Sequence, residues 1–373
     1  MERQAIIVVD EDFNKMRSNT HPALHDLCGT KVIQHVINNL RNAGIDDIFL
    51  RIEEQSKNGV QEAFVGLPVL TDHNIEAVDT VVISAVSPLL NSDMIESLFL
   101  EDEPNIYVGD ADCLIISKES TDKLTHDSIE EMAKQIGAIE GDFSVFTIES
   151  RSDLANAAHI MRSQILERLM NDGVTIIDPF NTYIDATVQI GMDSVIYPST
   201  LIKGETVIGA NTVIGANCEI TNARIGDNVE IKHSVISDSE IGDKTTVGPF
   251  AQIRPGTILG KEVKVGNFVE TKKAELKDGS KVSHLSYIGD AEIGERTNIG
   301  CGSITVNYDG VNKFKTTVGN DAFIGCNSNM IAPITIGNRA VIAAGSTLTE
   351  DVPDDSLAIA RERQTNKENY YKK

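Results

Sequence analysis

The chain has 373 residues, of which 41% are hydrophobic and 24% charged, a composition typical of a soluble protein with two or three domains. Its formal net charge of −23 repels nucleic acid, anionic membranes and anionic metabolites alike. An anionic substrate would therefore need a local basic pocket. The five cysteines form no CxxC pair and no Cys/His cluster, which argues against a disulfide framework and a zinc site. No apolar run approaches the roughly 18 residues of a membrane span, so we expect a cytoplasmic protein.

Residues 1–155 are interpreted as an α/β domain, because strand-like apolar runs alternate with helical or loop stretches. Residues 30–44 have helical periodicity and end at Gly44. The alternation predicts a parallel sheet covered by helices. The expected strands are residues 5–10, 46–52, 79–85, 104–110 and 143–149.

A long helix is predicted over residues 152–172, where aliphatic side chains recur at helical spacing until Gly173. From residue 184 the hydrophobic period changes to six, which fits neither a helix nor a plain strand. Hexapeptide repeats of this kind build a parallel β-helix, with one flat side per repeat and roughly nine three-sided coils over residues 184–350. The inward aliphatic positions are Ile184, Ile190, Ile196, Ile202, Ile208, Ile214, Ile220, Val318, Ile324, Met330, Ile336, Ile342 and Leu348.

The expected organisation is therefore an α/β domain (1–155), a connecting helix and linker (156–180), a β-helix (181–352) and a basic tail (353–373). Two places interrupt the six-residue period. Between Ile220 and Ile241 some steps shorten to five residues, which predicts tighter corners. Residues 305–317, TVNYDGVNKFKTT, are polar and rich in turn formers, which predicts a loop that leaves the prism and can carry function.

The run VGNFVETKKAELKDGSKVSHLSYIGDAEIGERTNIGCGSITVNYDGVNKFKTTVGNDAFIG resembles the acetyltransferase half of the bifunctional N-acetylglucosamine-1-phosphate uridyltransferase / glucosamine-1-phosphate N-acetyltransferase family. The similarity extends from GVTIIDPFNTYID at residue 173 to AIARERQ at residue 364. The resemblance implies a left-handed β-helix, a homotrimer, a shortened nucleotidyltransferase-like Rossmann-type sheet in the first domain, and acetyl transfer from acetyl-CoA to the amine of glucosamine 1-phosphate.

Carried over by position, the family's catalytic base corresponds to His284. The resemblance also implies a site built between subunits, to which the loop bearing Lys313 and the tail bearing Arg361 contribute. The implied sugar-phosphate contacts are Arg254, Lys272, Tyr287, Asn298, Asn307 and Lys313, and the implied acetyl-CoA contacts are Cys301, Cys326, Ala344 and Arg361.

These residue types fit the implied chemistry. A histidine with a pKa near 6.5 can take the proton from an amine that attacks a thioester, which contributes roughly 10² to 10⁴ in rate. Arg254, Lys272 and Lys313 would supply a local positive field within an acidic protein. Cys301 and Cys326 depart from the family, which more commonly has Ala and Ser there. They are interpreted as tolerated small replacements, with a role of Cys326 as acyl carrier as the alternative.

The first domain has lost the family's uridyltransferase landmarks. Asp10, Glu11 and Asp12 stand where a Gly-rich loop should bind the nucleotide phosphates, and Pro22 stands in place of a lysine. Val86 takes the place of the metal-binding Asp of the family, and Glu149 that of its second metal ligand, normally Asn. We therefore expect no uridyltransferase activity and no Mg²⁺ site, and a domain that remains as a scaffold, a trimer buttress or a regulatory site.

Two other readings of the second half stay open. One is a hexapeptide acyltransferase that uses another amine acceptor. The other is a non-catalytic scaffold descended from the enzyme, although the retained histidine, asparagines and basic residues favour activity.

Overall fold

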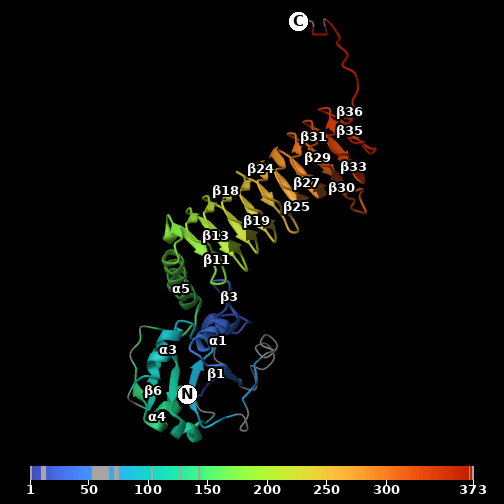
Figure 1. Cartoon of the computed structure of the whole chain (residues 1–373). Coiled ribbons are helices and arrows are strands. Elements are labelled where there is room, and N and C mark those ends of the chain that lie inside the picture. The colour runs from blue at the N-terminus through green and yellow to red at the C-terminus, as the bar shows by residue number, and fades with distance from the viewer. Residues whose placement is uncertain are drawn as a thin grey trace. The chain divides into compact units, whose positions relative to one another are not determined.

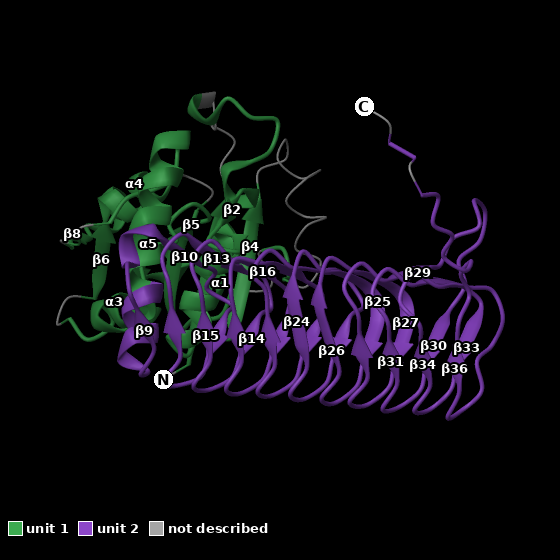
Figure 2. Cartoon of the chain, turned by 90° about the horizontal axis from the view of Figure 1, so that it is seen from above, with its two compact units in different colours: residues 1–164 green, residues 165–373 purple. Residues whose placement is uncertain are grey.

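The chain forms two compact units, residues 1–164 and 165–373, whose division falls within helix α5 (Arg151–Asn171) of the computed structural model (Figures 1 and 2). The structure describes residues 2–9, 14–52, 67–70, 75–101, 104–125, 128–141, 143, 145–368 and 370–371. The expected acidic loop residues Asp10, Glu11 and Asp12 lie outside the described residues. No helix in the described part of the chain combines the length and apolarity needed to cross a membrane.

The first unit is built on a six-stranded sheet of order β4-β1-β5-β7-β6-β8. Its strands are β1 (Arg3–Val9), β4 (Asp47–Ile52), β5 (Asp79–Ser84), β6 (Asn105–Val108), β7 (Cys113–Ile116) and β8 (Ile139–Glu140). Its helices besides α5 are α1 (Val32–Asn42), α3 (Ser92–Leu98) and α4 (Ile129–Ile136), and a two-stranded ribbon joins β2 (Asp26–Leu27) to β3 (Thr30–Lys31).

The prediction of an all-parallel sheet is wrong at one strand. β7 runs antiparallel to both β5 and β6, so the sheet is mixed. The chain reverses after β6 through a short turn in which Asp112 adopts a left-handed conformation, with φ 43°. That turn brings the apolar run 113–116 back beside β6, between β5 and β6 in the sheet.

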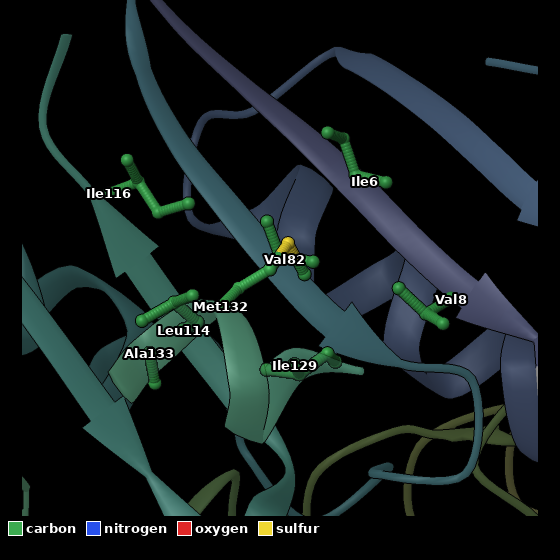
Figure 3. Packing of buried hydrophobic residues seen from close by; sticks show 8 residues of the cluster. All are labelled: Ile6, Val8, Val82, Leu114, Ile116, Ile129, Met132 and Ala133. Carbon is green, nitrogen blue, oxygen red and sulfur yellow. The ribbon is translucent and has the colours of Figure 1, made fainter. Parts of the chain in front are cut away.

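The strand predicted over residues 143–149 is also wrong. Its described residues form no strand, although Val145 and Ile148 are buried and the amide of Ile148 donates to the carbonyl of Val86 at 2.9 Å. The core of this unit packs α4 against the sheet (Figure 3). The cluster comprises Ile6, Val8, Val82, Leu114, Ile116, Ile129, Met132 and Ala133.

The second unit is a parallel β-helix with three faces. Face one is an 11-stranded parallel sheet that begins after α5 and ends near the tail. Its strands are β9 (Thr175–Ile176), β12 (Val195–Ile196), β15 (Val213–Ile214), β18 (Glu230–Ile231), β21 (Thr246–Val247), β24 (Lys264–Asn267), β26 (Lys281–His284), β28 (Asn298–Ile299), β31 (Phe323–Ile324), β34 (Val341–Ile342) and β36 (Leu357–Ala358).

Faces two and three follow on each coil. Face two contains β10 (Thr182–Ile184), β13 (Thr200–Lys203), β16 (Glu219–Thr221), β19 (Val235–Ser237), β22 (Gln252–Ile253), β25 (Glu270–Leu276), β27 (Tyr287–Ile293), β29 (Ile304–Val306), β32 (Asn329–Ile331) and β35 (Thr347–Leu348). Face three contains β11 (Gln189–Ile190), β14 (Val207–Ile208), β17 (Arg224–Ile225), β20 (Glu240–Ile241), β23 (Ile258–Leu259), the second halves of β25 and β27, β30 (Thr316–Val318) and β33 (Ile334–Ile336).

The hexapeptide prediction is confirmed by the register of these strands. Thr182 pairs with Thr200 in the next coil, and the aliphatic repeat positions point inward and are buried, apart from the half-buried Ile190. The tighter steps between Ile220 and Ile241 keep their aliphatic residues in the core. The loop predicted after Ile304 also forms. Residues 307–315 leave the prism between β29 and β30, and the chain rejoins it where Thr316 pairs with Ala291 of β27.

Candidate functional site

The catalytic candidate His284 belongs to a ladder of equivalent corner positions on consecutive coils. Asn267 pairs with His284, and the registers Val282–Ile299, Ile299–Ile324 and Ile324–Ile342 extend the same position through the following coils. Each ladder residue lies two positions after a buried aliphatic residue of face one. The ladder is therefore Asn267, His284, Cys301, Cys326 and Ala344, so that the candidate base and three of the candidate acetyl-CoA contacts occupy one corner.

The side chain of His284 is exposed and is oriented by a hydrogen bond. Its Nδ1 lies 2.5 Å from Oδ1 of Asn267, which can only accept, so Nδ1 carries the proton in this pairing. In the neutral imidazole Nε2 is then left with its lone pair available. The corner thus presents a histidine nitrogen that can accept a proton, with its tautomer set by Asn267.

The residue that directly follows each ladder position becomes smaller from the coil of Cys301 onward. On three coils it is bulky and apolar, namely Phe250, Phe268 and Leu285, whereas the coil before them has His233. The rings of Phe250 and Phe268 stack with centroids 5.4 Å apart and planes 8° apart. Leu285 continues this ridge and is 57% exposed. From Cys301 onward the corresponding residues are small: Gly302, Asn327 and Gly345. The corner therefore has an apolar ridge from Phe250 to Leu285 and a low edge of smaller residues after it.

Three of the predicted basic residues come together on face two and beside it. The pKa of Lys272 is lowered, chiefly by the positive charge of Lys313 and then by that of Arg254. Repulsion of this kind indicates cations held close to one another, as expected of a site that binds an anion. Arg254 also donates to the carboxylate of Glu270, with which it forms an ion pair.

Tyr287 lies on the same face as this cluster, at the start of β27. It pairs with Glu270, and Gly289 pairs with Lys272. The phenol ring covers Gly289, since a Cβ added to that glycine would lie 2.3 Å from the Tyr287 hydroxyl oxygen. The absence of a side chain at residue 289 therefore allows the ring to lie along the strand towards Lys272.

The loop 307–315 is tied back to the prism at both ends. Near its start, the Asn307 amide donates to the carboxylate of Asp290 at 2.5 Å. Near its end, Lys315 and Lys277 both donate to Glu292, and these two lysines lower the pKa of Glu292 to about 2. A shallow pocket of about 430 Å³ lies beside the loop, lined by Gly256, Ile258, Lys273, Ala274, Glu275, Asp290, Ala291, Glu292, Lys313, Phe314 and Lys315.

Two predicted contacts lie apart from these groups. Asn298 is half-buried on face one, three residues before Cys301, and pairs with Lys281 and Phe323. Arg361 follows β36, and its Cδ lies 3.7 Å from the point where a Cβ on Gly345 would stand. Arg361 thus continues the low edge of the corner towards the tail.

A second pocket, of about 470 Å³, lies in the first unit beyond the carboxyl ends of β1 and β5. Two of its lining residues, Lys15 and Glu149, form an ion pair. Pro22 and Val86 also line it. Within the described residues, no three His, Cys, Asp or Glu side chains are grouped so that they could hold a metal ion.

Sequence reasoning missed Asn267 and the ladder itself. The spacing in the sequence could have indicated this contact, because Asn267 precedes His284 by 17 residues, close to the length of one coil. Residues one coil apart lie side by side in neighbouring strands, so the two side chains are in direct contact.

Comparisons with known proteins identify two family models in the second unit. "GMPPB C-terminal domain" matches residues 179–275, and "Bacterial transferase hexapeptide (six repeats)" matches residues 315–350. A curated relative, the bifunctional protein GlmU of Staphylococcus haemolyticus, is 42% identical over 451 aligned positions that cover 100% of both chains. GlmU of an Exiguobacterium species is 37% identical over 459 positions, again covering 100% of both.

Among solved structures, the UDP-N-acetylglucosamine acyltransferase of Francisella novicida matches 50% of this chain and 67% of its own, with 19% identity and a TM-score of 0.37. The alignment to the staphylococcal relative spans 451 positions, whereas this chain has 373 residues. Part of that alignment therefore has no counterpart here.

Proposed function

This chain belongs to the family of the bifunctional protein GlmU, and from that premise we propose that its β-helix transfers an acetyl group from acetyl-CoA to the amine of glucosamine 1-phosphate. The observation that carries the proposal is the corner ladder. It joins an oriented histidine to a row of small residues, Cys301, Cys326 and Ala344, along which a long, thin acyl carrier can lie.

The reaction is a direct transfer. His284 Nε2 takes a proton as the substrate amine attacks the thioester carbon; the C–N bond forms, the C–S bond breaks and the CoA thiolate leaves. Asn267 keeps His284 in the tautomer that can accept this proton. Holding the amine and the thioester side by side supplies much of the remaining acceleration, and no covalent enzyme intermediate is needed.

The phosphate of the acceptor binds the cations on face two. Arg254, Lys272 and Lys313 repel one another in the free protein, so an anion that binds among them relieves that repulsion. Tyr287 lies between this cluster and the corner of His284, where it can contact the sugar ring, and Asn307 and Asn298 are proposed as further polar contacts. This arrangement favours a phosphorylated amino sugar over a neutral amine.

The active unit is proposed to be a homotrimer whose subunits share each site. The exposed apolar ridge of Phe250, Phe268 and Leu285 supports burial of this corner in an assembly, since contiguous apolar surface of this kind marks protein interfaces. Lys313 lies beside Lys272 and Arg254 of its own chain, so the expectation that its loop serves a neighbouring subunit is not kept, whereas the tail bearing Arg361 is proposed to reach a neighbouring subunit. The acetyl-CoA contacts, including Arg361, would then come from more than one chain.

Uridyl transfer is proposed to be lost. The pocket in the first unit presents the apolar Val86 where the family has a metal-binding Asp, and its Glu149 is engaged by Lys15. The shorter chain agrees with this loss, because the relatives align over more positions than this chain has residues. The first unit then serves as a scaffold or a regulatory domain within a cytoplasmic enzyme of UDP-N-acetylglucosamine synthesis.

The test is release of the CoA thiol from acetyl-CoA with glucosamine 1-phosphate, with UTP consumption followed in parallel. We expect His284→Asn to lower turnover by at least about 100-fold. His233→Asn is the matched control, because His233 is an exposed histidine on an earlier coil that also pairs with an asparagine, Asn217. An unaffected His284→Asn variant would refute the catalytic role, and UTP turnover with Mg²⁺ and N-acetylglucosamine 1-phosphate would refute the loss of uridyl transfer.

A further inference from the structure

Two cysteines occupy equivalent positions on neighbouring coils. Cys301 and Cys326 each lie two residues after a buried isoleucine, and those isoleucines, Ile299 and Ile324, pair in register. The amide of Asn327 donates to the carbonyl oxygen of Cys301 at 2.7 Å, so the two chain segments remain stacked at the cysteines. Neighbouring strands lie about 4.8 Å apart, and the Cα atoms of a disulfide lie roughly 4.4–6.8 Å apart. The backbone spacing therefore permits a bond between them.

Both thiols reach the surface at the low edge of the corner. Cys326 is exposed and Cys301 is half-buried. Cys113 and Cys218 differ, because they are buried and burial raises the pKa of both thiols, which keeps them protonated and unreactive. Cys28 is half-buried in the first unit, with its sulfur 3.7 Å from the carbonyl oxygen of Ala158.

We propose that Cys301 and Cys326 form a dithiol site that reacts with low-molecular-weight disulfides and closes into an intramolecular disulfide. The more exposed Cys326 reacts first: its thiolate attacks one sulfur of R–S–S–R, and one R–S⁻ leaves with the electron pair. The Cys301 thiolate then attacks Sγ of Cys326 and expels the second R–S⁻. The two leaving thiolates take up the two protons that the cysteines lose, so the protein is oxidised and the small disulfide is reduced by two electrons.

The consequence for activity rests on the proposed function. Cys301 and Cys326 are the first two ladder positions beyond His284, where that proposal places the acyl carrier. An R–S group on Cys326 fills this edge, and the closed disulfide fixes both side chains across it. Either form obstructs acetyl-CoA, whereas reduction restores the open edge. Disulfides of reducing compartments are typically transient and regulatory in this way.

The first experiment measures the bond without relying on catalysis. The folded, full-length protein is incubated with oxidised glutathione and, in parallel, with the disulfide of CoA; free thiols are counted and the products are mapped by mass spectrometry after alkylation. We expect a cross-linked Cys301–Cys326 peptide with either reagent. Cys326→Ser should prevent the reaction, and Cys301→Ala should stop it at a mixed disulfide on Cys326. Cys28→Ser is the control and should behave as the wild type.

A stable mixed disulfide on wild-type Cys326, or a cross-link that requires Cys28, would overturn the dithiol site. The second experiment compares acetyl transfer before and after oxidation. We expect kcat/KM for acetyl-CoA to fall at least about tenfold, equivalent to about 1.4 kcal/mol, and to recover with dithiothreitol. Unchanged transfer by the cross-linked protein would refute the obstruction of the donor. Inactivity of the reduced wild type would refute the proposed function instead, and the cross-link measured in the first experiment would be unaffected.

Discussion

The ion pairs of Glu292 allow a quantitative test of how the loop 307–315 is held. Lys277 and Lys315 lower the pKa of Glu292 from its ordinary 4.5 to about 2. At 1.36 kcal/mol per unit this shift corresponds to about 3 kcal/mol of stability. The two lysines are 39% and 61% exposed, so solvent screens the pairs, and exposed ion pairs contribute about 0.2–1 kcal/mol each. We therefore expect Glu292→Gln to destabilise the β-helix by about 0.4–2 kcal/mol at pH 7, the sum of two such pairs.

The pH dependence gives this prediction its sign. Because the folded-state pKa is the lower one, the contribution of Glu292 is complete above about pH 4.5 and is lost as the pH falls towards 2. Urea unfolding of the β-helix, followed by circular dichroism at pH 7, 4 and 3, should show the difference between wild type and Glu292→Gln shrinking with acidity. Glu240→Gln, an exposed glutamate on face three, is the control and should change little. A difference that is absent at pH 7, or constant down to pH 3, would refute the reasoning.

Three further predictions concern the corner and the cationic cluster. Asn267→Ala should lower kcat about tenfold, because His284 loses the hydrogen bond that orients its ring, an effect of about 1.4 kcal/mol, while KM for acetyl-CoA stays near its original value. Lys272→Gln should raise KM for the sugar phosphate yet leave the melting temperature unchanged or slightly higher, because it removes a repelled cation whose pKa is lowered in the fold. In Gly289→Ala the new Cβ meets only the end of the Tyr287 side chain, so KM for the sugar phosphate should rise with little loss of stability. In Gly294→Ala the new Cβ lies 2.4 Å from the backbone carbon of Gly319, so thermal unfolding should show a loss of about 1–3 kcal/mol.

The β-helix could be predicted from the sequence because each of its coils depends on local information. An aliphatic residue every six positions specifies an inward side chain on each flat side, and the register of the strands then follows from coil length alone. The first unit lacks this property. Strand β7 is a short apolar run whose direction depends on the turn at Asp112, and the alternation of apolar segments does not report direction.

The strand predicted over residues 143–149 is wrong for a related reason. Val145 and Ile148 are apolar and buried, but burial alone does not require a strand. The amide of Ile148 finds its partner in the carbonyl of Val86, outside any strand of the sheet. Hydrophobic periodicity indicates which residues face a core, but it does not indicate which backbone groups form hydrogen bonds with one another.

The candidate site lies where the regularity of the β-helix is broken, and this has a physical reason. A perfect repeat presents the same surface at every coil, so it cannot specify a place for a single molecule. Here Lys264 pairs with Lys281, one residue short of the usual step, β25 and β27 run continuously across a corner, and the loop 307–315 lengthens the next coil. Seven of the site candidates lie within this irregular stretch: Lys272, His284, Tyr287, Asn298, Cys301, Asn307 and Lys313. The coils on either side hold these residues in register. Shortened steps also occur on earlier coils, so it is the two strands that cross a corner and the loop 307–315 that give these residues their particular surroundings.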